Sequence, residues 1–163
     1  MRSHTPATGV LATVAVVSVG AVAAALVSQH VFDMQPCPWC VLQRLIFLVV
    51  GAAALLGVLW RSLLGQRLAA AGVLIVSLLG AAAALWQHFV ASSSSSCNLT
   101  LADRILSTLT LDARLPQVFA AYASCADGKV NLFGLPYEFW SLLLFVLLGA
   151  TAVGLLLGRL RGR

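Results

Sequence analysis

Residues 37–60 read CPWCVLQRLIFLVVGAAALLGVLW, a pair of cysteines followed directly by an apolar run that ends at Trp60. Two thiols separated by two residues close only a very small, strained disulfide ring, and strain raises the reduction potential. Such a disulfide is a poor structural crosslink and a good electron carrier. The stretch therefore predicts a redox-active pair, Cys37 and Cys40, at the beginning of a membrane-spanning helix.

A helix that begins at this pair would stabilise a thiolate. Pro38 has a fixed φ and no backbone N–H, so it suits the first turn of a helix whose positive end points at the two sulfurs. Arg44 follows Cys40 by four residues, one helical turn, and so lies on the same face. We therefore predict that Arg44 favours an anion beside Cys40. Two other interpretations stay open: Arg44 could extend to a lipid headgroup, and the pair could be half of a zinc site.

The composition is that of a membrane protein. Of 163 residues, 61% are hydrophobic and only 9% are charged, which leaves too few polar residues to cover a soluble globule of this size. The net charge of +5 does not indicate nucleic-acid binding, because the sequence has no basic patch with interleaved aromatic residues. We expect this chain to be surrounded by the lipid bilayer and to bind no nucleic acid.

Four apolar stretches are long enough, or nearly so, to span the hydrocarbon core of a bilayer. We predict an all-α membrane protein with a single domain over residues 1–163, a four-helix transmembrane bundle with spans at about 10–27, 41–60, 68–89 and 139–157. The loops on one side would be residues 28–40 and 90–138, and the segments on the other side residues 1–9, 61–67 and 158–163. The first span also resembles a secretory signal, since Arg2 precedes an apolar core and Ala21-Val22-Ala23 resembles a cleavage site. We take it as a membrane anchor.

Residues 97–137 form the one sizeable non-membrane segment. Thr100 and Asp103 resemble a helix start, and Leu101, Ile105 and Leu109 mark an apolar stripe at four-residue spacing. We predict a short amphipathic helix that lies on the membrane surface in this second outer loop.

Charged residues divide between the two sides of the predicted bundle. The side of the termini carries six arginines and no acidic residue: Arg2, Arg61, Arg67, Arg159, Arg161 and Arg163. The opposite side carries four basic and five acidic residues. By the positive-inside rule the arginine side is cytoplasmic, so we expect both termini in the cytoplasm. All four cysteines then face outwards, into an oxidising compartment.

Cys97 follows a run of five serines, residues 92–96, and Cys125 lies further along the same outer loop. A structural disulfide between them would close a loop of about 28 residues and stabilise the fold by roughly 3–4 kcal/mol in the chain-entropy model. A redox-active pair is the alternative that we favour. Thiol exchange needs a sulfur that can approach its partner, and a serine linker provides that reach.

His88 lies near the outer end of the third span, beside Gln87. A histidine in such a position is often an interfacial residue without a site. His88 and Arg44 are nevertheless predicted at the same depth in the bilayer and could face one cavity beside Cys40. Such a cavity would suit a lipid-soluble redox cofactor with carbonyl oxygens, held by a hydrogen-bond donor from each residue.

These features occur together, and in this order, in a known family. Four spans, a CxxC that opens the second, an arginine four residues on, a histidine that ends the third, two outer-loop cysteines and the segments LPQVF (115–119) and LFGL (132–135) resemble DsbB, the bacterial quinone-dependent disulfide oxidase. The resemblance covers nearly the whole chain. It implies a thiol oxidoreductase of the bacterial inner membrane that reoxidises a periplasmic, thioredoxin-like DsbA-type oxidase and passes the electrons to a membrane quinone.

The resemblance also implies roles for the cysteines. Cys97 would form the mixed disulfide with the DsbA-type partner, and its mate Cys125 would pass the electrons to Cys37. Four cysteines allow three full pairings, and our working hypothesis is Cys37 with Cys40 and Cys97 with Cys125. Because a DsbA-type partner is already a strong oxidant at about −120 mV, only an acceptor of higher potential can reoxidise it.

At the far end of the implied relay, Cys40 would face ubiquinone or menaquinone. Arg44 would stabilise its thiolate and the reduced quinone, with His88 near the quinone ring. The chain departs from the family pattern in two places: the link from His88 to Cys97 is short and almost all serine, and Gln43 stands where some relatives carry an acidic residue. Neither departure removes a residue that the implied mechanism needs.

Two other functions compete with this one. A thiol oxidoreductase of the vitamin K epoxide reductase kind also couples cysteine pairs to quinone, but in that family the loop cysteines precede the CxxC, whereas here the CxxC comes first. The other is a small transporter or a structural membrane protein with an incidental disulfide. Proton-coupled transporters usually bury a carboxylate at mid-membrane, and no Asp or Glu falls within the predicted spans.

Overall fold

The computed structural model describes residues 6–91, 100–124, 131–132 and 134–159. Four helices in this part of the chain are long and apolar enough to cross a membrane. They are α1 (Pro6–Val31), α2 (Pro38–Leu59), α3 (Leu63–Phe89) and α7 (Tyr137–Leu156). The predicted fold class, an all-α four-helix membrane bundle, is confirmed. Each helix begins before its expected span, because its first turn extends beyond the purely apolar stretch.

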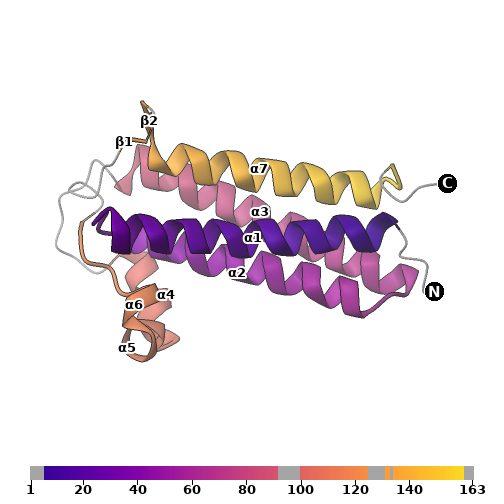
Figure 1. The fold of residues 1–163 in the computed structure, drawn as a ribbon, viewed down its shortest axis with the longest axis horizontal. Helices are drawn as coiled ribbons and strands as arrows, with labels where there is room; N and C mark the ends of the chain where they lie inside the picture. The colour runs from indigo at the N-terminus through magenta and orange to yellow at the C-terminus, as the bar shows by residue number, and fades with distance from the viewer. Residues whose placement is uncertain (1–5, 92–99, 125–130, 133, 160–163) are drawn as a thin grey trace.

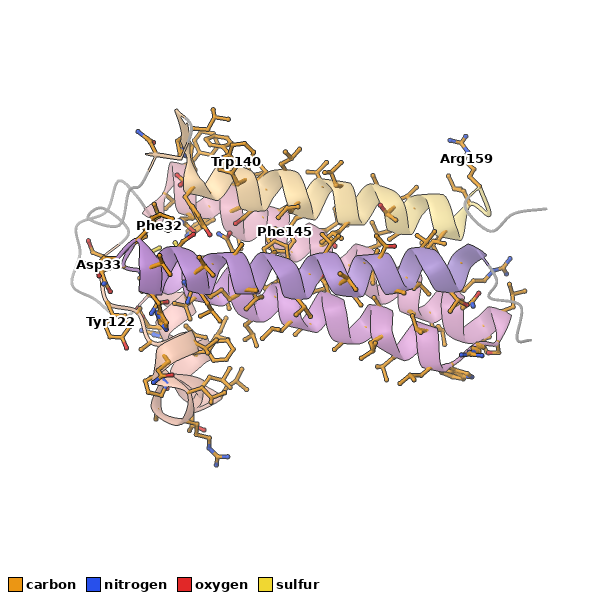
Figure 2. The ribbon with its side chains drawn as sticks, viewed as in Figure 1. Phe32, Asp33, Tyr122, Trp140, Phe145 and Arg159 are labelled. Carbon is orange, nitrogen blue, oxygen red and sulfur yellow. The ribbon has the colours of Figure 1, made fainter. Side chains whose placement is uncertain are left out.

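The four long helices lie side by side along the length of the molecule (Figure 1). α2 packs on both α1 and α3, and α3 packs on α7. The link between α1 and α2 lies at one end of the bundle together with the short elements of the second loop, whereas the start of α1 and the end of α7 lie at the other end. Figure 2 shows Arg159 at the end opposite to Asp33 and Tyr122. The position of Arg159 agrees with the division of charges between the two ends that the sequence predicts.

Apolar side chains of the four long helices meet in one core. Leu11, Val50 and Val73 are almost fully buried there. Phe47 of α2 stacks on Phe145 of α7, with ring centroids 4.0 Å apart and ring planes 9° apart. This contact joins helices that are far apart in the chain and fixes the rotation of α7 about its axis.

Gly80 lets α3 approach α7 at this stacked pair. A Cβ built on Gly80 would lie 2.5 Å from Cζ of Phe145, a ring that its stacking on Phe47 holds in place. Gly80→Ala is therefore expected to lower the free energy of unfolding by about 1–3 kcal/mol, measured as a lower thermal midpoint in detergent. The matched control is Gly72→Ala, because a Cβ at Gly72 would meet only Ala53, at 3.8 Å. Equal stability of the two variants would contradict this packing.

The second loop contains the predicted short helix, α4 (Leu101–Thr108). It starts with a capping box: Thr100 Oγ1 accepts a hydrogen bond from the Asp103 N–H, and the Asp103 carboxylate accepts one from the Thr100 N–H. The helix packs on α2 and buries Ala102 and Leu106. The cap and the buried face together hold α4 at the end of the bundle where α2 begins.

The apolar stripe that we expect at the membrane surface stays largely exposed, and its residues Leu101 and Ile105 line a groove with Trp39 of α2 and Trp86 of α3. Leu101, Ile105 and Leu109 are 62%, 37% and 52% exposed. Two shorter helices follow, α5 (Leu111–Arg114) and α6 (Pro116–Phe119). Ahead of α7, two-residue strands β1 (Asn131–Leu132) and β2 (Leu135–Pro136) pair antiparallel.

Candidate active site

Cys37 and Cys40 enclose the first turn of α2. Cys37 is the N-cap residue, with φ −84° and ψ 164°, and Pro38 occupies the first helical turn. The Cys37 Sγ accepts a hydrogen bond from the Cys40 N–H at 3.4 Å, and the two sulfurs, both present as thiols, lie 2.9 Å apart. The predicted helix start at this pair is confirmed. Both sulfurs lie in the positive field of a helix N-terminus, which favours a thiolate.

The two thiols differ in access. Cys37 is 1% exposed and lies in one apolar cluster with Trp39 of α2 and Ala102 of α4. Cys40 is only partly buried and lines a cavity of about 230 Å³ between α1, α2, α3 and α7. The polar side chains on this cavity are Ser28, Gln35, Cys40, Gln43, Arg44, Gln87, Tyr137, Glu138 and Ser141. Of the two CxxC sulfurs, the one that can meet a ligand in the cavity is therefore that of Cys40.

Arg44 brings a buried positive charge to the same cavity. The residue is 5% exposed. Its Nη1 donates to Gln29 Oε1 of α1 at 2.6 Å and to the Val118 carbonyl of α6 at 3.0 Å, and its Nη2 donates to the Ala25 carbonyl at 3.4 Å. The prediction that Arg44 and Cys40 share a face is confirmed, since both line this cavity.

The guanidinium of Arg44 is only partly satisfied by these contacts. It has five N–H donors, so one on Nη2 and the one on Nε are without an acceptor among the described residues. No carboxylate in the described part of the chain forms an ion pair with it. A buried charge that has no counter-ion stabilises an anion placed beside it.

The same side chain ties the second loop to the bundle. Val118, whose carbonyl accepts from Arg44, lies in α6, and the adjacent Gln117 carbonyl accepts from Gln29 Nε2 at 3.5 Å. Gln29 thus contacts both Arg44 and the loop. The position of α6 depends on the residue that lies beside Cys40.

A second anchor lies further along the loop. The backbone N–H groups of Tyr122 and Ala123 donate to the Pro36 carbonyl, directly ahead of the CxxC, at 3.0 and 3.3 Å. Cys97 and Cys125 themselves lie outside the described residues. Their pairing and their roles therefore stay predictions.

His88 lies in the last turn of α3, as the sequence predicts. Its Nδ1 is 2.9 Å from Glu138 Oε1 in the first turn of α7, and its ring contacts Phe89 and Phe139 edge-on. Glu138, which is 7% exposed, lines the cavity, whereas His88 is not among the lining residues. The predicted position of His88 near a quinone ring stays a prediction. Glu138 was not predicted as a site residue, because 50 residues of sequence separate it from His88.

Two buried glutamines were also missed as site residues. Gln87 Nε2 donates to Cys40 Sγ at 3.2 Å, and Gln43 Nε2 donates to Gln87 Oε1 at 2.7 Å. Each glutamine directly precedes a residue that the sequence had singled out, Arg44 or His88. Polar residues near the ends of two apolar helices were the available signal.

Comparison with known proteins adds a family to this geometry. A family model described as Disulfide bond formation protein DsbB matches residues 7–155, from α1 to α7. Relatives called Disulfide bond formation protein B come from Ralstonia nicotianae, 33% identical over 150 residues (91% of this chain and 92% of the relative), and Cupriavidus metallidurans, 33% over 151 residues (88% and 89%). A third, from Herminiimonas arsenicoxydans, is 32% identical over 140 residues (85% and 88%).

Proposed function

The chain belongs to the DsbB family of disulfide bond formation proteins, and on this premise we propose that it is a thiol:quinone oxidoreductase. As a member of the family it is a multi-pass membrane protein and a disulfide-forming oxidoreductase. In the proposed function it reoxidises a periplasmic DsbA-like dithiol oxidase. It passes the electrons to a membrane quinone, ubiquinone or menaquinone.

The observation that carries this proposal is the buried charge of Arg44 on the cavity that Cys40 also lines. Within the described residues that charge has no carboxylate partner. It therefore lowers the energy of a negative charge in the cavity, either on the Cys40 sulfur or on an oxygen of a reduced acceptor. If Cys37 and Cys40 formed only a structural disulfide, or if Arg44 served only to pack the helices, no buried charge without a carboxylate partner would be needed beside Cys40.

The cavity fits a quinone head group. Its walls include the apolar side chains of Ala21, Phe47 and Leu144, and Arg44 contributes the two N–H donors that have no acceptor in the described part of the chain. A flat ring with carbonyl oxygens needs such walls and such donors. A quinone bound there would supply a two-electron acceptor of higher potential than a DsbA-like partner.

Glu138 and His88 give the cavity a place to hold a proton. The 2.9 Å contact between His88 Nδ1 and Glu138 Oε1 is short enough for the two groups to share one. The Glu138 side chain is 9% exposed and that of His88 is 32% exposed. A proton held at Glu138 Oε1 can therefore exchange with water through the histidine ring.

Electrons reach Cys40 by thiol–disulfide exchange. We propose two consecutive exchange steps. The dithiol of the partner first reduces a disulfide between Cys97 and Cys125, and the resulting pair of loop thiols then reduces the CxxC disulfide. Each exchange breaks one S–S bond and forms another, so the two electrons and two protons move together. The hydrogen bond that holds Ala123 at Pro36 supports the second exchange, because Cys125 follows Ala123 by two residues in the sequence.

The proposed location is the bacterial inner membrane, with both termini in the cytoplasm and the cysteines on the periplasmic side. Arg159 supports this orientation, since it lies at the end of the bundle opposite to Asp33 (Figure 2). Arginines concentrate on the cytoplasmic side of membrane proteins. The thiol chemistry also needs the oxidising compartment, because cytosolic reductants keep thiols reduced.

Quinone reduction by the purified protein in detergent tests the function. A reduced DsbA-like thioredoxin-fold protein is the electron donor, ubiquinone and menaquinone analogues are the acceptors, and the absorbance of the quinone is followed with time. Turnover with at least one quinone is expected. Absence of turnover with either acceptor, in protein that keeps its helical circular dichroism spectrum, would contradict the proposed function.

Cys97→Ser separates the two halves of the relay. With the DsbA-like donor this variant is expected to lose turnover, because the loop disulfide that the partner's thiolate would attack cannot form. With excess dithiothreitol, which can reduce the CxxC disulfide directly, it is expected to keep most of the parental rate. Equal rates of parent and variant with the protein donor would contradict the role of Cys97.

A further inference from the structure

Two side-chain amides form a chain that ends on the Cys40 sulfur. Gln43 of α2 and Gln87 of α3 are 3% and 6% exposed. Gln43 Nε2 donates to Gln87 Oε1 at 2.7 Å, and Gln87 Nε2 donates to Cys40 Sγ at 3.2 Å. Because the oxygen of Gln87 is held by Gln43, its NH₂ group is turned to the sulfur.

The direction of this chain matters because a carboxamide has one donor end and one acceptor end. In the observed direction Gln87 offers a donor to Cys40, which stabilises a thiolate. In the reverse direction Gln87 would donate to the oxygen of Gln43 and would offer its own oxygen to Cys40, which stabilises a protonated thiol. Glutamine at position 43 permits either direction, whereas a carboxylate there can only accept and imposes the reverse one.

A second contact of the Cys40 sulfur agrees with the direction of the hydrogen bonds from Gln43 through Gln87 to Cys40. Cys37 Sγ lies 2.9 Å from Cys40 Sγ, and either sulfur can be the donor. If Cys40 carries the thiolate, the Cys37 S–H donates to it, and the Cys37 sulfur still accepts from the Cys40 backbone N–H at 3.4 Å. Cys40 then receives two hydrogen bonds, one from Cys37 and one from Gln87.

We propose that Gln43 and Gln87 form an amide relay in which Gln43 sets the orientation of Gln87, and Gln87 holds Cys40 as the reactive thiolate of the CxxC pair. Gln87 touches the reacting sulfur and is a catalytic residue, whereas Gln43 acts through it and is a positioning residue. The inference rests on the proposed function only in taking Cys40 as the sulfur that hands on the electrons. The charged and titratable groups that share the cavity with Cys40 are Arg44, Tyr137 and Glu138, and the relay itself adds no net charge.

The test is the alkylation rate of Cys40 by iodoacetamide at pH 7, because the thiolate is the species that reacts. The protein is the full chain with Cys37, Cys97 and Cys125 replaced by serine, so that Cys40 is the one remaining thiol and the Cys37→Ser change keeps a hydroxyl donor beside it. Gln87→Met conserves volume and removes the donor. It is expected to slow alkylation about 10-fold, the factor that one hydrogen bond to a charged group provides.

Gln43→Glu is expected to slow alkylation to a similar extent, about 5- to 10-fold, because Gln87 must turn its oxygen to the sulfur. A carboxylate would also repel the thiolate directly, so the variant is repeated in the Gln87→Met background. In that background only the direct repulsion remains, because no amide is left to turn, so Gln43→Glu is expected to slow alkylation clearly less than it does in the presence of Gln87. An undiminished effect of Gln43→Glu in the Gln87→Met background would overturn the relay.

Gln66→Met is the matched control. Gln66 is a glutamine of the same helix, 5% exposed, whose Nε2 donates to Thr8 Oγ1 at 3.0 Å. It lies near the opposite end of α3 from Gln87. Alkylation in this variant is expected to match the parental rate, and a slowing equal to that of Gln87→Met would assign the effect to general loss of packing and overturn the proposal.

An equilibrium measurement gives an independent readout. In protein with Cys97 and Cys125 replaced by serine, Gln87→Met is expected to shift the equilibrium of the CxxC pair with glutathione about 5-fold towards the disulfide, because the reduced pair loses the thiolate contact. An unchanged equilibrium would overturn the relay. Quinone reduction by the parental protein is measured alongside. If the parental protein does not reduce quinone but the alkylation rates of the variants follow the expected order, the proposed function is contradicted and the relay still holds.

Discussion

Cys40→Ser is expected to abolish quinone reduction, with a loss of at least about 10³-fold, because a serine hydroxyl neither ionises near neutral pH nor forms a disulfide. Cys40 lines the cavity, and the other described cysteine, Cys37, does not. No other thiol in the described part of the chain can therefore replace it. The rate is measured optically with dithiothreitol as the donor, so that the result does not depend on the outer loop. A rate close to that of the parent would contradict the assignment of Cys40.

Cys37→Ser is the informative comparison. It is also expected to stop turnover, since the CxxC disulfide cannot form, but it leaves the more accessible thiol in place. With the loop cysteines replaced by serine in both proteins, iodoacetamide should label Cys40 in Cys37→Ser faster than it labels Cys37 in Cys40→Ser. The reason is burial, because Cys37 is 1% exposed under α4 whereas Cys40 opens on the cavity. The opposite order would contradict the site geometry.

Arg44→Met is expected to have the next largest effect and to act in two places. Quinone reduction should fall about 10²-fold, since a hydrogen bond to a charged group is worth about 1.5–3 kcal/mol and the cavity loses its positive charge. The second loop should also loosen, because the Val118 carbonyl of α6 loses the donor that holds it. Amide hydrogen exchange of residues 117–119 is therefore expected to become faster in the same variant.

Two further variants separate these effects. Arg44→Lys keeps the charge but replaces a planar group with five donors by a single ammonium, so it should recover part of the rate and little of the protection of α6. Arg67→Met removes an exposed arginine near the start of α3, the helix whose last turn carries Gln87, and should change neither. A large loss of rate in Arg44→Met with unchanged exchange would show that Arg44 does not anchor α6.

The helices and the thiol pair could be predicted because their causes lie within short stretches of chain. Apolar stretches about 20 residues long predict membrane helices from length and hydropathy, and the structure has four such helices among the described residues. Pro38 after Cys37 predicts a helix start at the sulfurs, and the Thr100–Asp103 pattern predicts the start of α4. The spacing from Cys40 to Arg44 is a single helical turn, so helix geometry alone placed them on one face.

The remaining part of the site depended on contacts between distant parts of the chain. Gln87 and Gln43 are 44 residues apart, and Val118 and Arg44 are 74 residues apart. Whether such residues meet depends on how far each helix is rotated and shifted against its neighbours. That rotation is set by side-chain packing, such as the Phe47–Phe145 stack.

The sequence by itself determined that this protein is a four-helix membrane bundle with a closely spaced thiol pair at the start of its second long helix, because hydropathy, helix capping and thiol spacing are local properties. Tertiary structure alone decided what surrounds that pair. It placed Glu138 rather than His88 on the cavity, turned the amide of Gln87 to Cys40, and gave Arg44 the second task of holding α6. These contacts arise when helices pack, and packing depends on the whole set of side chains at once.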